Sequence, residues 1–275
     1  MIDLDKRALI TLEQEAGGRL GVCAIDTASG RTLAHRADER FAMCSTFKLP
    51  LAAAILQRAD QGKLKLDTFV PYGKADMVSY APVTELNLEK GGMTIGALAE
   101  AAQKTSDNVA ANLLLKQVGG PQGFTLFFRD IGDEVTRLDR YEPDMNAGGV
   151  GNDARDTTTP AAMAATVRKL MTGDTLTAGS RKVLRDWMID TRTGLKRLRA
   201  GLPEAWITGD KTGTSVDGKM GKYNDVAVAW RGDRAPLVVA AYFNVPQTSD
   251  AIEDQYQAVL AEVGHIASVW AGWTR

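Results

Sequence analysis

A serine and a lysine stand three residues apart at the start of an apolar run, in the stretch FAMCSTFKLP of residues 41–50. Residues three apart share one face of a helix, so a helix beginning at Ser45 would bring the Lys48 amine beside the serine hydroxyl. The positive end of the helix dipole and its free N–H groups would also favour negative charge on that oxygen. The pair therefore fits a nucleophilic serine with its own base, although it also fits a plain helix cap beside a solvated lysine.

Two other short motifs could supply partners for such a serine. The Ser-Asp-Asn run 106–108 follows a polar turn and opens an expected helix, and the Lys-Thr-Gly run 211–213 lies on an expected strand. A Ser-His-Asp triad has nothing to build on, because His35 and His265 lie far apart and outside any motif. Any base that activates Ser45 must therefore come from another residue type.

The pattern of apolar residues predicts a sheet whose strands are split along the chain. Apolar runs predict two strands near the N-terminus, at 19–26 and 31–36. Three more strands are expected late in the chain, at 205–214, 224–232 and 235–245. Short hairpin links between them imply one five-stranded antiparallel sheet.

Helical periodicity, with cap residues or terminal glycines, dominates the intervening chain and both ends. The expected helices are 4–15, 45–63, 93–105, 106–120, 158–173, 176–190 and 249–273. The fold class is therefore α/β, more strictly α+β, with a five-stranded antiparallel sheet flanked by terminal helices and an inserted all-helical domain. Residues 1–44 and 191–275 would form the discontinuous sheet domain and residues 45–190 the helical domain, with the site between them.

The composition limits the classes of function. The 33 basic and 34 acidic residues nearly cancel and form no block of one sign, so neither a nucleic acid nor a membrane surface is an expected partner. The two cysteines, Cys23 and Cys44, give neither a disulfide framework nor metal-ligand spacing, and no metal or other cofactor is expected. We expect a monomer that acts on a small molecule.

In this order, the Ser-x-x-Lys, Ser-Asp-Asn and Lys-Thr-Gly motifs resemble the set found in class A serine β-lactamases and penicillin-binding proteins. The resemblance to a class A β-lactamase covers essentially the whole chain, including the split sheet and the helical insertion. Residues 137–156 lack sustained periodicity, and a loop of that length in a compact domain is usually functional. Within it, Arg-Tyr-Glu-Pro-Asp-Met-Asn at 140–146 resembles the omega loop of the family.

The resemblance implies that a β-lactam is opened through an acyl-serine. Ser45 would be the nucleophile, and its proton would go to Lys48 or Glu142, with the acylation base left open between these two. Ser106 would relay a proton to the departing ring nitrogen. Glu142, with Asn146 holding the same water, would be the base that frees the acyl group, a contribution of roughly 10²–10⁴ in rate. An enzyme without that base would stay acylated.

The resemblance also implies residues that bind the substrate or shape the site. The expected substrate-binding set is Tyr80, Asn108, Arg197, Lys211, Thr212, Gly213, Thr214 and Ser215. The backbone N–H groups of Ser45 and Thr214 would form an oxyanion hole. Arg140 and Asp156 would clamp the omega loop, and the Glu142–Pro143 bond could be cis, as in many relatives.

The chain departs from the family pattern at three places. The family often carries an arginine on the strand after Lys-Thr-Gly, where this chain has Tyr223, and we expect Arg197 to replace it near the substrate carboxylate. Some relatives bridge a cysteine at the place of Cys44 to one where Ser215 stands here, so Cys44 is expected to be a small buried thiol. The segment 215–223 looks about three residues longer than in common relatives, and its glycines suggest a protruding hairpin.

The expected function is a hydrolase that opens penicillins and cephalosporins, confers antibiotic resistance and accepts the mechanism-based inhibitors of the family. D,D-peptidases of peptidoglycan and penicilloyl sensor domains are the two alternatives that share the serine, but they lack an activated water, so Glu142 favours the hydrolase. An accidental set of motifs in a plain globular domain is the last alternative. The resemblance places the mature protein in the periplasm or outside the cell, with no export signal within residues 1–18.

Overall fold

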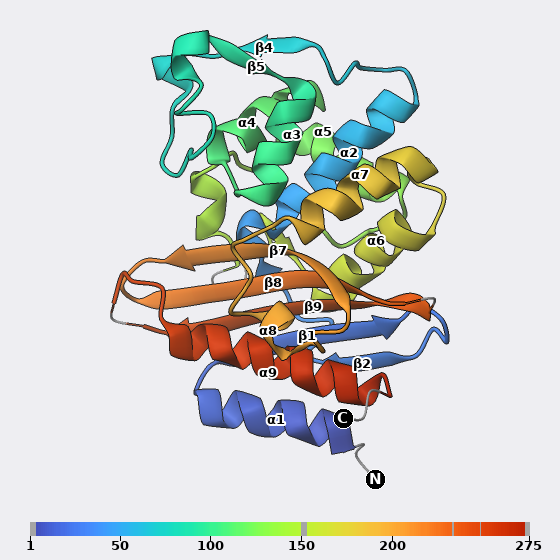
Figure 1. Ribbon diagram of the computed structural model, residues 1–275. Coiled ribbons are helices and arrows are strands. Elements are labelled where there is room, and N and C mark those ends of the chain that lie inside the picture. Colours follow the sequence, from blue (N-terminus) through green and yellow to red (C-terminus); the bar gives the residue numbers. More distant parts are fainter. Residues whose placement is uncertain (1–3, 150–152, 233, 248, 273–275) are drawn as a thin grey trace.

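The structure, a computed structural model, describes residues 4–149, 153–232, 234–247 and 249–272, and its centre is one antiparallel sheet (Figure 1). The strand order is β2-β1-β9-β8-β7. The strands are β1 Arg19–Asp26, β2 Thr32–His35, β7 Ile207–Val216, β8 Met220–Arg231 and β9 Arg234–Pro246. β1 pairs with β9 along its whole length, from Arg19 opposite Asn244 to Asp26 opposite Leu237. The predicted five-stranded sheet, built from both ends of the chain, is confirmed.

Each face of the sheet buries its own apolar core, because side chains alternate along a strand. On β9, Val238, Ala240 and Tyr242 pack into the core beneath the helical body. Their neighbours Val239 and Phe243 pack into the core beneath the terminal helices. Burial on both faces explains why this strand is a continuous apolar run rather than an alternating one.

The terminal helices cover one face of the sheet (Figure 1). They are α1 Leu4–Ala16 and α9 Asp254–Trp270, with the single turn α8 Leu198–Gly201 beside them. Leu9 of α1 and Leu260 and Val263 of α9 are fully buried in the core of that face. These helices therefore form a layer that closes the sheet on the side away from the helical body.

The helical body lies on the other face and contains most of the predicted helices. They are α2 Lys48–Asp60, α3 Ile95–Lys104, α4 Asn108–Gln117, α5 Gly120–Asp130, α6 Pro160–Thr172 and α7 Ala178–Ile189, with the 3₁₀ turns η1 Cys44–Phe47, η2 Lys74–Asp76, η3 Leu88–Lys90 and η4 Asp144–Ala147. Residues 45–190 also contain three short strands: β4 Phe69–Pro71 pairs with β5 Gly92–Thr94, and β6 Thr157–Thr158 pairs with β3 Phe41–Ala42, which precedes this range. The expectation that residues 45–190 are entirely helical is therefore wrong in detail.

Helix α5 was not predicted, and its sequence explains why. The run GGPQG at 119–123 reads as a loop, but Gly119 is in a left-handed conformation before the helix and Pro121 fits its first turn. Phe124 and Phe128 then pack against each other with ring centroids 4.8 Å apart. Tertiary packing of these rings stabilises a helix that local propensity does not indicate.

Helix α2 runs through the middle of the helical body. Its residues 48–56 are all buried, as expected of a helix enclosed on every side. This burial places the first residue of the helix, Lys48, in the interior rather than in solvent. The position of α2 therefore decides the environment of the Ser-x-x-Lys motif.

Strands β7 and β8 form a regular hairpin that projects beside the cleft. Val216 pairs with Gly221, and Gly218 occupies the turn with a φ of 70°. The Asp217 Oδ1 atom accepts hydrogen bonds from the backbone N–H groups of Lys219 and Met220, which fixes the turn. The hairpin expected from the glycines of this segment is therefore present.

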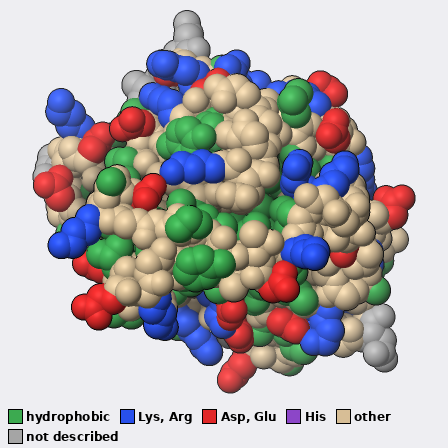
Figure 2. Space-filling view, turned by 90° about the horizontal axis from the view of Figure 1, so that it is seen from above, with side chains coloured by type: hydrophobic (Ala, Val, Ile, Leu, Met, Phe, Trp, Pro, Cys, Tyr) green, Lys and Arg blue, Asp and Glu red, His purple; other side chains and the backbone are tan. Residues whose placement is uncertain are grey.

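Charged side chains of both signs are interspersed on the face of the helical body seen from above (Figure 2). This mixture agrees with the net charge of −1 and gives that face no extended field of one sign. Among the residues described, none of the helices has the length and apolar character needed to cross a bilayer.

Candidate active site

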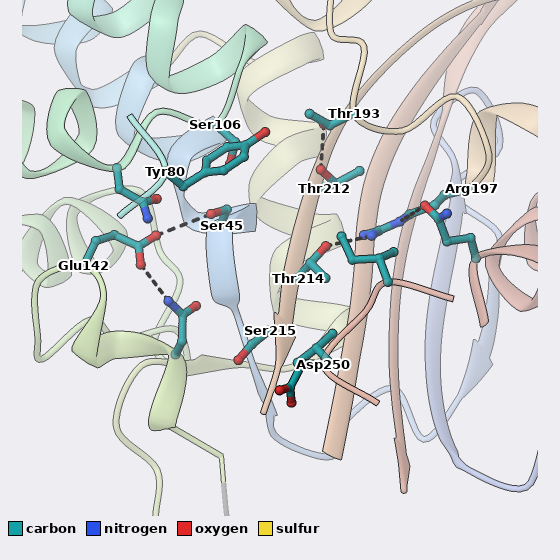
Figure 3. A pocket seen from close by; sticks show the side chains of 15 residues that line it. Ser45, Tyr80, Ser106, Glu142, Thr193, Arg197, Thr212, Thr214, Ser215 and Asp250 are labelled. Carbon is teal, nitrogen blue, oxygen red and sulfur yellow. Dashed lines mark hydrogen bonds between the residues drawn. The ribbon is translucent and has the colours of Figure 1, made fainter. Parts of the chain in front are cut away.

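Ser45 lies in η1, directly before α2, where the helical body meets the sheet (Figure 3). The preceding residue, Cys44, has a φ of 45°, and neighbours must stabilise this left-handed conformation because it is costly for a side chain with a Cβ. One such neighbour is Asn224 of β8, whose Nδ2 donates to the carbonyl oxygens of Ala42 at 2.9 Å and Met43 at 3.1 Å. The sheet thus fixes the backbone that presents Ser45.

The Lys48 ammonium is fully buried among polar atoms from three segments. Its Nζ atom lies 2.9 Å from Ser45 Oγ and 3.1 Å from Glu142 Oε1. It also donates to the carbonyl oxygen of Ser106 at 2.8 Å and to Asn108 Oδ1. Burial lowers the pKa of Lys48, and the negative charge of Glu142 opposes that shift. Lys48 lies beside the serine, as the spacing predicts, in a site that makes its amine easier to deprotonate.

Glu142 reaches the same serine from the segment 137–156. Its Oε1 atom accepts the Ser45 hydroxyl at 3.3 Å, and its Oε2 atom accepts Asn146 Nδ2 at 2.7 Å. The Asn146 Oδ1 atom is buried and has no hydrogen-bond partner among the described residues. A buried acceptor of this kind is suited to a bound water. Both oxygens of the carboxylate are therefore oriented, with one directed at the serine.

The Ser-Asp-Asn run places a second hydroxyl between two lysines. Asp107 caps α4 by accepting the Ala110 N–H at 2.8 Å. The residue before this cap, Ser106, has a φ of 63°. Its Oγ atom lies 3.0 Å from Lys211 Nζ and 3.5 Å from Lys48 Nζ. The Ser106 hydroxyl therefore connects the two ammonium groups, which is a suitable place for a proton relay.

Strand β7 forms the wall of the cleft opposite the glutamate loop (Figure 3). A Cβ atom on Gly213 would lie 2.6 Å from Met43 O and 3.1 Å from Ser45 N. Only glycine permits this close approach, which brings the backbone of β7 beside the serine N–H as an oxyanion hole requires. Lys211 is also buried on β7, and burial and the like charge of Lys48 lower its pKa well below the usual value.

Arg197 is buried beside β7, with 2% of its surface exposed. Its Nη2 atom donates to Thr214 Oγ1 at 2.7 Å, and its Nη1 atom donates to the Asn224 carbonyl at 2.8 Å. The guanidinium carbon lies 5.6 Å from the ring centroid of Tyr223, whose hydroxyl turns away to Gln247. Arg197 thus brings a guanidinium to the Lys-Thr-Gly strand, while Tyr223 packs beside it.

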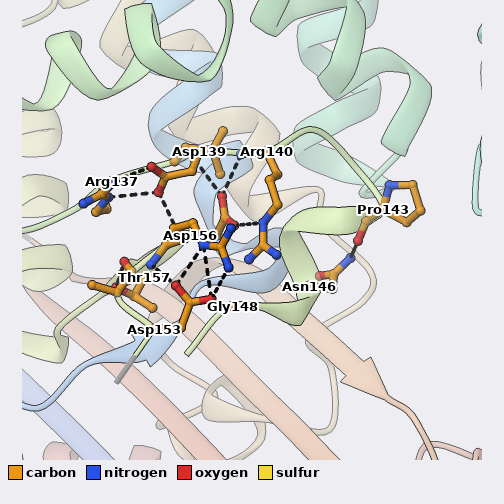
Figure 4. A network of polar contacts seen from close by, with 12 residues as sticks. Arg137, Asp139, Arg140, Pro143, Asn146, Gly148, Asp153, Asp156 and Thr157 are labelled. Atoms are coloured by element: carbon orange, nitrogen blue, oxygen red, sulfur yellow. Dashed lines mark hydrogen bonds and ion pairs between the residues drawn. The ribbon is translucent and has the colours of Figure 1, made fainter. Parts of the chain in front are cut away.

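Arg140 and Asp156 join the two ends of the glutamate loop (Figure 4). The buried Asp156 Oδ2 accepts Arg140 Nε at 2.6 Å, and its Oδ1 accepts the backbone N–H groups of Asp139 at 2.7 Å and Arg140 at 3.0 Å. The Glu142–Pro143 bond is cis, in agreement with the prediction. Residues 150–152 of the predicted loop lie outside the described residues.

A cleft of about 450 Å³ lies between β7 and this loop, within the range of small-molecule sites. It is lined by Ser45, Tyr80, Ser106, Asn108, Glu142, Asn146, Thr193, Arg197, Thr212, Thr214, Ser215, Val216, Asp250, Ile252 and Gln257. Three predicted site residues, Lys48, Lys211 and Gly213, do not line the cleft and are buried behind its surface. The structure therefore gathers every predicted catalytic and substrate-binding residue in or directly behind one cleft.

Backbone conformations that are unusual for residues with a Cβ also gather here. Of the five described non-glycine residues with positive φ, four lie in or beside the site: Cys44, Tyr80, Ser106 and Asp156. Such conformations cluster at functional sites, where the surrounding structure stabilises them. Cys44 is a free, fully buried thiol like Cys23, and burial raises the pKa of Cys44 to about 12.

Two residues of the site were missed by the sequence analysis. Asn112 makes two hydrogen bonds with the backbone of Glu142. Its Nδ2 donates to the Glu142 carbonyl oxygen, and its Oδ1 accepts the Glu142 N–H, each at 2.9 Å. Its position four residues after Asn108 on one helix was an available signal. Thr193, whose Oγ1 lies 2.7 Å from Thr212 Oγ1, comes from a loop and carries no local signal.

The fold and the site together define a serine enzyme of the acyl-transfer class. Its serine oxygen is in contact with both an amine and a carboxylate, and it lies beside a strand that approaches its backbone N–H. An activated nucleophile with a neighbouring base and a donor for a developing oxyanion is the arrangement that acyl transfer requires.

Comparisons with known proteins identify the family. The beta-lactamase enzyme family matches residues 5–270. The chain is 48% identical over 255 residues to Beta-lactamase AST-1 of Nocardia asteroides, covering 93% of this chain and 80% of that protein. It is 46% identical over 256 residues to Carbapenem-hydrolyzing beta-lactamase KPC of Klebsiella oxytoca, covering 93% and 85%. The solved structure of an ancestral (GNCA) class A β-lactamase has a TM-score of 0.90 and 54% identity, covering 97% of this chain and 99% of that chain.

The chain therefore belongs to the β-lactamase enzyme family, within class A. Its reaction is the hydrolysis of β-lactams, the reaction that confers resistance to these antibiotics. Class A β-lactamases are typically secreted or periplasmic.

Proposed function

We propose that the chain hydrolyses penicillins and cephalosporins through an acyl-enzyme on Ser45, with Glu142 as the base for deacylation. The observation that carries the proposal is the orientation of the carboxylate, with one oxygen 3.3 Å from Ser45 Oγ and the other 2.7 Å from Asn146 Nδ2. A D,D-peptidase or a penicilloyl sensor has no such base beside its acyl group. The geometry favours turnover over a trapped acyl-enzyme.

In acylation, Ser45 Oγ bonds to the lactam carbonyl carbon and the ring C–N bond breaks. The serine proton leaves to Lys48 or Glu142, which lie 2.9 Å and 3.3 Å from Oγ, and both routes stay open. Ser106 gives its hydroxyl proton to the ring nitrogen and takes a proton from Lys48, which either received the serine proton itself or is resupplied by Glu142 at 3.1 Å. The backbone N–H groups of Ser45 and Thr214 stabilise the oxyanion, and loss of one such donor typically costs about 10²–10³ in rate.

In deacylation, a water held by Asn146 loses a proton to Glu142 and its oxygen bonds to the acyl carbon. The bond from that carbon to Ser45 Oγ then breaks, and the proton on the glutamate returns to the serine oxygen. Asn112 supports this step by fixing the backbone of Glu142. General-base catalysis of this kind is worth roughly 10²–10⁴ in rate.

The remaining cleft residues bind and orient the substrate in this proposal. We assign substrate contacts to Tyr80, Asn108, Arg197, Lys211, Thr212, Gly213, Thr214 and Ser215. The cationic groups of this set stand on or beside β7, where a β-lactam carboxylate would be received. The mechanism-based inhibitors of the family carry the same carboxylate and would use the same contacts.

The domain division and the cellular context are further parts of the proposal. Residues 1–44 and 191–275 would form a sheet domain and residues 45–190 a helical domain, with the cleft at their junction. The mature protein would be a monomer in the periplasm or the medium, acting on a small molecule without a nucleic acid, membrane or cofactor. Light scattering of the purified chain tests the monomer.

Covalent labelling tests the nucleophile. The wild type should hydrolyse a chromogenic cephalosporin, whereas Ser45→Ala should neither hydrolyse it nor gain the mass of a bound penicillin. Ser29→Ala is the matched control, because Ser29 is an exposed serine in the turn between β1 and β2, outside the cleft lining, and this variant should still be acylated. Acylation of the Ser45→Ala variant would contradict the proposal.

A further inference from the structure

A buried lysine of the β7–β8 hairpin contacts the glutamate loop. Lys222 lies on β8 opposite Ser215 of β7, and paired residues on adjacent strands direct their side chains to the same face. Lys222 is 4% exposed. Its Nζ atom donates to the carbonyl oxygens of Asn146 at 2.7 Å and Gly148 at 3.2 Å. The sheet therefore contacts the loop through this ammonium.

The carbonyl groups of Asn146 and Gly148 belong to the part of the glutamate loop that orients the Glu142 carboxylate. Asn146 lies in the 3₁₀ turn η4, and Gly148 follows its end. The last carbonyls of a helical turn have no partner within it, and a cation is a favourable partner for them. The side chain of the same Asn146 donates to Glu142 Oε2 at 2.7 Å. A continuous series of contacts thus runs from Lys222 through Asn146 to Glu142.

The burial of Lys222 makes these contacts important. The described hydrogen bonds of the Lys222 ammonium go to the two loop carbonyls. A buried ammonium is costly unless its donors are satisfied. Displacement of the η4 turn would leave this charge unsatisfied, so the lysine resists movement of the turn.

We propose that Lys222 is a positioning residue for deacylation, which fixes the backbone of Asn146 and thereby the water and the Glu142 carboxylate. This inference rests on the proposed role of Glu142 in deacylation. Lys222 contacts neither Ser45 nor Lys48, so its effect should fall on deacylation and spare acylation. This selectivity separates positioning from a general contribution to folding.

The test is to measure acylation and deacylation separately in Lys222→Met, a substitution that keeps the length of the side chain and removes its charge and donors. Acylation is followed by stopped flow at high enzyme concentration, and loss of the acyl adduct is followed by mass spectrometry. The deacylation rate of Lys222→Met should fall by about tenfold or more, which is part of the roughly 10²–10⁴ that general-base catalysis contributes. Its acylation rate should change by less than about threefold. Lys222→Arg, which keeps donors for both carbonyls, should recover most of the rate.

Lys219→Met is the matched control, because Lys219 is exposed in the turn of the same hairpin and its described hydrogen bonds are made by its backbone N–H and carbonyl groups. Its two rates should equal those of the wild type. Deacylation is a first-order rate of the acylated molecules, so it can be measured even if part of the variant misfolds. Deacylation of Lys222→Met within twofold of wild type, or equal losses in both steps, would overturn the inference. Absence of turnover in the wild type would instead overturn the proposed function.

Discussion

At the scale of single residues, the site depends on charged side chains kept away from water. Lys48 and Lys211 are fully buried, and burial lowers the pKa of both. An amine with a lowered pKa can take a proton at a pH where a solvated lysine cannot. Glu142 opposes this effect at Lys48 because its negative charge favours the ammonium. The Glu142 carboxylate therefore offsets part of the effect of burial on the pKa of Lys48.

Arg197→Ala should weaken the binding of penicillins and mechanism-based inhibitors. The variant loses the guanidinium beside Thr214, so the substrate carboxylate would lose a charged partner, and KM should rise by about tenfold or more. The effect on kcat should be smaller. Steady-state kinetics measure both constants. Lys196→Ala, at an exposed neighbouring position, should leave them unchanged, and unchanged kinetics in Arg197→Ala would show that Arg197 does not recognise the substrate.

At the scale of elements, the spacing of short motifs is informative because each motif lies on a single turn or strand. The Ser-x-x-Lys spacing predicts the contact between Lys48 and Ser45, which the structure has at 2.9 Å. Contacts between segments that lie far apart in the chain cannot be predicted from such local spacing. The pairing of Thr193 with Thr212 and the contact of Lys222 with Asn146 join residues far apart in the chain, and no local pattern marks them.

The contacts within the omega loop were likewise not predictable from local sequence patterns. Its length without sustained periodicity predicts a functional segment, and the prediction of an Arg140–Asp156 clamp came only from the resemblance to a family. Helix α5 was missed because glycines and a proline at its start resemble a turn, while packing of its phenylalanines stabilises it. Local chemistry could therefore be predicted, whereas elements stabilised by tertiary packing could not.

Arg140→Ala should loosen the glutamate loop. The fully buried Asp156 side chain would keep its backbone N–H donors but lose its cation, and breaking a buried pair typically costs about 3–5 kcal/mol. The free energy of unfolding should fall by about 3 kcal/mol, near the lower value because Arg140 is partly exposed. Urea unfolding measures the change. Arg155→Ala, which breaks the exposed pair with Asp153, should lower the free energy of unfolding much less than Arg140→Ala does. Equal losses in both variants would contradict the clamp.

At the scale of the whole molecule, the sheet meets the α8 turn at buried charges. Asp210 of β7 and Asp225 of β8 are fully buried, and Arg199 pairs with Asp210. Burial and the neighbouring negative charge of Asp210 raise the pKa of Asp225 well above its usual value. These charges make the stability of the molecule depend on pH.

Asp225→Asn should change that dependence. The folded state binds the Asp225 proton more tightly than the unfolded chain, so this contribution to stability is complete below a pH of about 3.9 and is lost as pH rises through the folded pKa. The variant removes the titration and keeps an oxygen for the Leu198 N–H. The free energy of unfolding of Asp225→Asn, relative to wild type, should therefore increase as pH rises above about 4, up to the folded pKa of Asp225.

Urea unfolding at a series of pH values measures this difference. Asp174→Asn, at an exposed position, is the control and should give a difference that does not change with pH. A constant or decreasing difference for Asp225→Asn would show that folding does not raise the pKa of Asp225.

The central claim is that Ser45 forms the acyl-enzyme with the β-lactam and that Glu142 activates the water that hydrolyses it. The most direct measurement is the mass of Glu142→Ala during incubation with a cephalosporin, beside the wild type. The wild type should turn over with little acylated protein at the end, whereas the variant should accumulate a stable adduct on Ser45, with deacylation slower by roughly 10²–10⁴. Rapid loss of the adduct from Glu142→Ala, at a rate close to that of the wild type, would contradict the account.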